Sequence, residues 1–216
     1  MNELYNNNLI VLQNATDKAF ELIRKLYDLN YFDKTNYEKN IGDFNIINVN
    51  NEEEIQEEFA KYNPVLNKLV IKNETLFEEV LKEDEVCLQV LHGLINMAST
   101  DRDNNKYGFV FEGLPFTNDY NDACAWYLAY KLFYGEEFDK LFDKNNDFSN
   151  LSLVKGAVDA LNEETIFNGF FEGDFKKSID ALSPKELDTI NDYLFNINEN
   201  LKARLGLEEE DALVHG

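Results

Sequence analysis

Two residues in one apolar stretch have types and a spacing that could support chemistry. His92 and Asn96 stand four positions apart. In an α-helix this spacing places both side chains on one face, about one turn from each other. An imidazole can bind a metal ion or transfer a proton, whereas an Asn amide is a poor zinc ligand beside imidazole or thiolate. The simplest alternative is a buried histidine that is satisfied by hydrogen bonds and has no chemistry of its own.

The stretch that carries both residues, 86–100, has the period of a helix. Its apolar residues recur at steps of three and four, at Val86, Val90, Leu91, Leu94, Ile95 and Met97. This pattern predicts an amphipathic to fully buried helix. Gly93 lies inside it with no side chain to explain its presence. If Gly93 has no packing role, a Gly93→Ala substitution should stabilise the fold by about 0.5–1 kcal/mol, whereas a clear loss of stability would indicate close packing or a backbone contact at that position.

Short strands and further helices must position this helix. Strands are predicted at 44–49 and 67–72, which are bounded by turn-forming residues, and 107–111 could be a strand or an extended segment after a polar loop at 101–105. Residues 9–12 could be a short strand or the first turn of a helix, and 74–82 a short helix or a loop. Apolar periodicity and capping residues predict helices at 16–30, 52–62, 117–133, 151–161, 163–171, 174–182 and 183–204. Thr16 or Asp17 would be the N-cap of the first, Asn63-Pro64 would end the second, and the third would end before Gly135.

Composition restricts the class of protein and its partners. The 216 residues are 44% apolar, with 17 Phe and 11 Tyr, which is typical of a globular protein. The formal charge is −22, from 20 Lys and Arg against 42 Asp and Glu. Because nucleic acids and anionic membranes are bound through cationic side chains, neither is expected to bind this chain.

The positions of the cysteines and the lengths of the apolar runs indicate the cellular compartment. Cys87 and Cys124 both lie in apolar helical patterns and form no Cys-x-x-Cys pair, so they are expected to be buried thiols in a reducing compartment. The first residues lack a basic segment followed by an apolar core, and no apolar run reaches the ~18–20 residues of a membrane span. A cytoplasmic location is expected.

The order of these elements resembles a known family. A strand at 67–72 leads to a helix reading Leu-His-x-Leu-Ile-x-Met-Ala-Ser, followed by a polar loop, a Gly-Phe segment and a second helix that opens with Asn and an acid. Residues 163–174 extend the similarity. Together they resemble a bacterial branch of the zincin-like metallopeptidases, over about residues 67–182.

The resemblance implies a degenerate site. A working zincin helix reads His-Glu-x-x-His, with two zinc ligands and a Glu general base. Here His92 matches the first ligand, Gly93 the base and Asn96 the second ligand. The acidic ligand position on the second helix matches Asp119, with Asp122 one turn on. No catalytic residue and no cofactor are expected; if the site binds any metal, His92 and Asp119 would be its ligands, and zinc would be present only if the site is not degenerate.

The resemblance also implies a fold and a function. The expected fold is α+β and predominantly helical, with a zincin-like core, short N-terminal strands and a helical C-terminal part. The division would be a core with a small sheet and two central helices at 1–135, a helical subdomain at 136–207 and a frayed acidic tail at 208–216. The favoured function is that of a non-catalytic pseudo-metallopeptidase that acts as a binding or interaction module for a protein partner. The alternatives are an active metal-dependent hydrolase with an unrecognised site and an acidic decoy that mimics nucleic acid.

Overall fold

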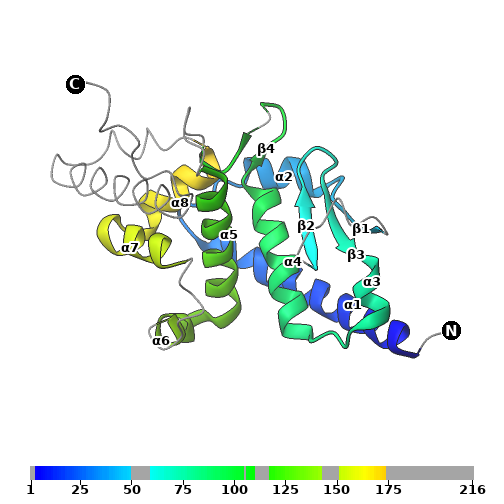
Figure 1. The fold of residues 1–216 in the computed structure, drawn as a ribbon. Helices are drawn as coiled ribbons and strands as arrows, with labels where there is room; N and C mark the ends of the chain where they lie inside the picture. The colour runs from blue at the N-terminus through cyan, green and yellow to red at the C-terminus, as the bar shows by residue number, and fades with distance from the viewer. Residues whose placement is uncertain (1–2, 50–58, 105, 110–116, 143–150, 174–216) are drawn as a thin grey trace, which may run out of the picture.

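The protein is α+β and predominantly helical, with two small sheets (Figure 1). The computed structural model describes residues 3–49, 59–104, 106–109, 117–142 and 151–173. The helices are α1 (Glu3–Ile23), η1 (Arg24–Asp28), α2 (Thr35–Ile41), α3 (Asn73–Glu78), α4 (Glu83–Ala98), α5 (Thr117–Tyr134), η3 (Gly135–Glu137), α6 (Phe138–Phe142), α7 (Ser152–Leu161) and α8 (Glu163–Glu172). The strands are β1 (Asn45–Val49), β2 (Ala60–Asn63), β3 (Lys68–Lys72), β4 (Thr100–Asp101) and β5 (Lys106–Tyr107).

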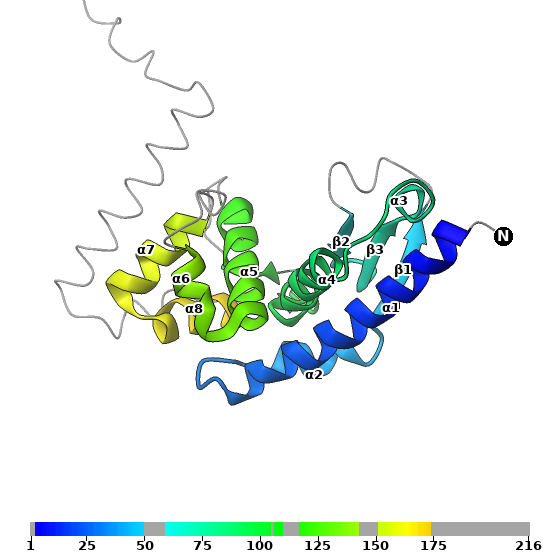
Figure 2. The ribbon, with the colours of Figure 1, turned by 90° about the horizontal axis from the view of Figure 1, so that it is seen from below.

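Helix α4 lies at the centre of the fold and confirms the helix predicted at 86–100. It stands between the three-stranded sheet and α5, and α1 packs along it (Figures 1 and 2). Every residue from Val86 to Ala98 except Gln89 is buried. A helix that is covered on all sides explains why its apolar residues are not confined to one stripe. Within the described residues, no helix is long and apolar enough to cross a bilayer.

The three-stranded sheet has the order β1-β3-β2 and confirms both predicted strands. β1 runs parallel to β3, with Ile46 opposite Leu69, and β2 runs antiparallel to it. The central strand β3 is the most buried, since Leu69, Val70 and Ile71 are each at most 2% exposed. This burial explains its continuous β-branched and aliphatic run.

Helix α1 starts earlier than its sequence pattern indicates. It already includes residues 9–12, so Thr16 and Asp17 lie inside the helix and the N-cap predicted there is wrong. The reason is a buried polar residue in the first turns. Asn8 is 2% exposed, and its side-chain amide donates to the carbonyl groups of Leu76 and Glu79. An Asn at a buried position breaks the apolar period from which the helix was predicted.

The acidic helix predicted at 52–62 is wrong over its described end. Residues 60–63 form β2, because Ala60 and Tyr62 are buried and Lys61 is exposed, the alternation of a strand with one buried face. Residues 52–58 lie outside the described residues. The helices predicted at 151–161 and 163–171 are confirmed as α7 and α8. Those predicted at 174–182 and 183–204, and the acidic tail, lie outside the described residues.

In the polar loop predicted at 101–105, residues 102–104 form a turn of a small hairpin. β4 and β5 pair antiparallel, with Thr100 opposite Tyr107. The Asp101 carboxylate accepts hydrogen bonds from the backbone amides of Asp103 and Asn104. The hairpin follows α4 directly and precedes α5, and this order brings Tyr107 close to both helices.

Both cysteines are buried free thiols, as predicted. Burial raises the pKa of Cys87 to about 11 and holds the pKa of Cys124 well above its ordinary value. At about pH 8, thiolate-directed reagents should therefore label neither thiol in the native protein and both after unfolding in denaturant. Rapid labelling of one thiol without denaturant would contradict the burial of that cysteine.

Candidate functional site

The imidazole of His92 joins α4 to α5 through two contacts. Its Nε2 atom lies 2.9 Å from Oδ1 of Asp122, and its ring stacks on Trp126 with centroids 4.1 Å apart and planes 7° from parallel. His92 is 4% exposed, whereas 47% of the Asp122 side chain is accessible. The pair thus sits at the edge of the core, with its carboxylate reaching solvent.

Asn96 extends this pair toward the hairpin. Its Oδ1 accepts a hydrogen bond of 2.7 Å from the Tyr107 hydroxyl, which directs its Nδ2 toward His92 Nε2 at 3.3 Å. One ring nitrogen cannot donate to Asp122 and accept from Asn96 at once. The shorter contact, to a carboxylate, requires the proton on Nε2. We refer to His92, Asn96, Tyr107, Asp122 and Trp126 as the His92 cluster.

Gly93 faces the sheet and not open space. A Cβ atom on Gly93 would lie 2.4 Å from Cδ1 of Leu69 on β3, and Leu69 is fully buried. The expectation that Gly93 has no packing role is therefore wrong. Glycine at this position lets α4 and β3 approach each other closely. A Glu side chain there would enter the core.

Asn121 holds the hairpin against α5 and so positions Tyr107. It is fully buried, its Oδ1 accepts from the Phe109 amide, and its Nδ2 donates to the carbonyls of Tyr107 and Phe109. The contact requires Gly108, which has φ +54° and leaves no room for a Cβ atom beside the Asn121 amide. The predicted Gly-Phe segment is thus an anchor point for the second helix.

The structure brings together three of the five predicted site residues, His92, Asn96 and Asp122. Asp119 lies in α5, but its side chain is not among those that the structure describes. The acid that meets His92 is Asp122, and it also follows an asparagine, so the Asn-acid pattern occurs twice in this segment. Trp126 and Tyr107 were not predicted as site residues. Trp126 could have been found, since it follows Asp122 by four residues and shares its helix face.

The His92 cluster does not match a working zinc site of the family that the sequence resembles. It supplies one imidazole and one carboxylate, and the described residues contain no group of three or more His, Cys, Asp or Glu side chains placed to hold a metal ion. A protein zinc site takes at least three such ligands, and its tetrahedral geometry separates two ligand atoms by about 3.4 Å. The 2.9 Å between His92 and Asp122 is instead the length of a hydrogen bond.

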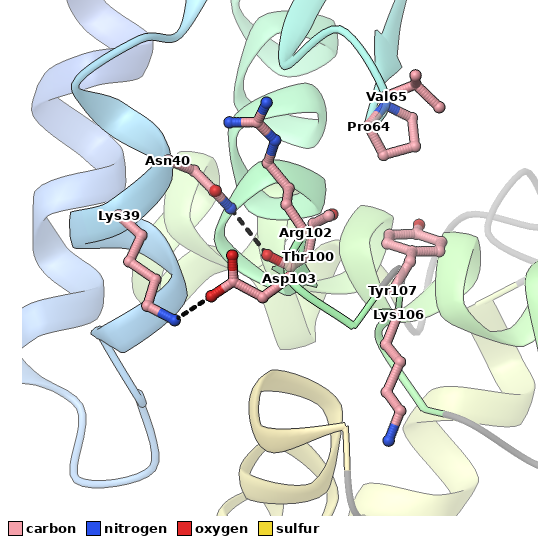
Figure 3. Close-up of a pocket in the computed structure, with 9 residues that line it drawn as sticks. All are labelled: Lys39, Asn40, Pro64, Val65, Thr100, Arg102, Asp103, Lys106 and Tyr107. Carbon is pink, nitrogen blue, oxygen red and sulfur yellow. Dashed lines mark hydrogen bonds and ion pairs between the residues drawn. The ribbon is translucent and has the colours of Figure 1, made fainter.

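A pocket of about 690 Å³ opens beside the cluster (Figure 3). Tyr107 is a member of the His92 cluster and also lines the pocket. Asn40 and Thr100 are almost fully buried in its wall, and the Asn40 amide donates to the carbonyl oxygens of Met97 and Thr100. The lining residues are Lys39, Asn40, Pro64, Val65, Thr100, Arg102, Asp103, Lys106 and Tyr107.

Comparison of the chain with protein-family models, curated proteins and solved structures finds no match to any of them. The function is therefore argued from the His92 cluster and from the pocket beside it.

Proposed function

We propose that the protein is a non-catalytic relative of the zincin-like metallopeptidases that serves as a binding module. The observation that carries the proposal is the pairing of His92 with Asp122. In a zinc enzyme both groups would direct their free atoms at the metal. Here the two groups face each other at 2.9 Å, and the amide of Asn96 occupies the position that matches the second zinc-ligand histidine.

Residue 93, which matches the general-base position of the family, supports the same proposal. A base must reach the water that it activates. Gly93 has no side chain, and the space that a side chain would enter is filled by Leu69. The helix is therefore packed in a way that disfavours a carboxylate side chain at position 93, and recovering a base there would require repacking of Leu69 on β3.

The remaining features of the cluster are those of a structural polar network. Tyr107 donates to Asn96, and His92 lies against Asp122 and stacks on Trp126. Buried polar contacts of this kind favour one arrangement of the elements that they join. These contacts join α4, α5 and the hairpin, and Tyr107 also lines the adjacent pocket.

The metal content of the protein tests the proposal. Protein purified without added metal or chelator should hold well under one equivalent of zinc, because His92 and Asp122 alone cannot retain it. The measurement is elemental analysis by mass spectrometry, paired with a peptidase assay on a denatured protein substrate in the presence of zinc. Stoichiometric zinc that survives dialysis against a chelator, or zinc-dependent peptide release, would contradict the proposal and favour an active hydrolase.

A further inference from the structure

The charge of the pocket is opposite to the charge of the chain. Three of its lining residues are cationic, Lys39, Arg102 and Lys106, and one is acidic, Asp103. In the whole chain, acidic residues outnumber basic ones by 42 to 20. This local excess of cations among the lining residues suits the pocket to an anion.

We propose that this pocket binds a small organic anion, with a phosphate or carboxylate head group and an apolar or aromatic body. The inference rests on the proposed binding function and gives it a ligand class, in place of the protein partner expected from the sequence. The volume lies in the range of small-molecule sites and exceeds the need of an inorganic ion. The body of the ligand would contact Pro64, Val65 and the Tyr107 ring.

The cations are held by exposed partners that a ligand can replace. Lys39 pairs with Asp103 at 2.9 Å, and Arg102 pairs with Asp43 at 2.9 Å. The Arg102 guanidinium, together with the Asn67 amide, holds the pKa of Asp43 below its usual value, so both members of this pair are charged at neutral pH. Exposed ion pairs contribute little stability, and a bound anion could take over one member of each.

Two lining residues, Lys106 and Asp103, have properties that a simple set of surface ion pairs would not explain. Lys106 forms no ion pair with any residue that the structure describes. Figure 3 shows the Asp103 carboxylate between Lys39 and the hairpin, where it bonds the Lys39 ammonium group. Asp103 is 73% exposed in its side chain, so it can turn away when a ligand anion replaces it. In the free protein, this carboxylate acts as an internal competitor.

The test is an NMR titration of the full chain with phenyl phosphate, benzoate and phenol. Phenyl phosphate or benzoate should cause saturable shifts in the backbone amides of Lys39, Thr100, Arg102 and Tyr107, and phenol should cause much smaller ones. Binding by phenyl phosphate alone identifies the head group as phosphate, and binding by both identifies a general anion site. Equal binding of phenol, or no saturable shift from any probe up to about 10 mM, would overturn the proposal.

Three variants separate recognition in the pocket from general electrostatics. Lys106→Gln should weaken binding about tenfold, because it removes a charged contact. Asp103→Asn should strengthen it about threefold, because it removes the competitor and frees Lys39. The matched control is Lys140→Gln on α6, at the far end of α5 from the hairpin (Figure 1), which removes an equal charge and should change affinity less than twofold.

Equal effects of Lys106→Gln and Lys140→Gln, or weaker binding in Asp103→Asn, would show that the pocket does not recognise the anion. The metal analysis described above does not depend on the pocket. A failure of the anion proposal is therefore distinguishable from a failure of the proposed non-catalytic function.

Discussion

The Asn96→His variant should bind zinc at least about 100-fold more tightly than the wild-type protein, a difference of about 2.7 kcal/mol. The substitution adds a second imidazole on the face that already presents His92. Asp122, whose carboxylate lies 2.9 Å from the His92 ring, would supply the third ligand. Three ligands of these types complete the protein part of a zinc site. Asp122 is half exposed and can move the roughly 0.5 Å that tetrahedral geometry requires.

Calorimetric titration of the two proteins side by side measures the difference. Trp126 gives an independent signal, because it is the only tryptophan and it stacks on His92. The control is the double variant Asn96→His with Asp122→Asn, which should return to weak binding. Equal, weak binding by Asn96→His and wild type would mean that the His92 cluster does not have zincin-like geometry. Tight binding that survives Asp122→Asn would assign the third ligand elsewhere, Asp119 being the first candidate.

Substitutions at Gly93 should lower the free energy of unfolding, in the order Ala then Glu. Gly93→Ala gains about 1 kcal/mol of helix propensity, but its methyl group must displace the buried Leu69 side chain, at a cost of about 1–3 kcal/mol. A net loss of up to about 2 kcal/mol is expected. Gly93→Glu also buries a carboxylate without a partner, which costs several kcal/mol more. We expect it to unfold at ambient temperature.

Chemical denaturation of single and double variants tests the cause. Leu69→Val removes the Cδ1 atom that a Cβ at position 93 would meet 2.4 Å away. In that background, Gly93→Ala should be neutral or stabilising. If Gly93→Ala stabilises the wild-type background by about 0.5–1 kcal/mol, helix propensity alone would govern the site. The same contact means that a hydrolase cannot be rebuilt by adding Gly93→Glu to Asn96→His, because the base would destroy the fold that holds the ligands.

Local patterns in the sequence determined the elements that carry the site. The three- and four-residue spacing in α4, the β-branched run of β3 and the end of α5 before Gly135 each depend on neighbours within one or two turns. The same locality explains the failures. Asn8 interrupts the apolar pattern of α1, and hydrogen bonds to α3 satisfy its side chain, whereas pairing with β3 sets the conformation of residues 60–63, where an acidic helix was predicted.

The sequence by itself also identified His92 and Asn96 as facing the same side, because a helix fixes that relation. Only the tertiary structure decided what they meet. The contact between Asp122 and His92 depends on how α5 packs against α4. The space beside Gly93 is filled by Leu69 because β3 approaches α4 closely. The cationic pocket likewise joins Lys39, Val65 and Lys106, which lie on three separate segments. Side-chain periodicity specifies which face of an element is buried, but it carries no information about the partner that buries it.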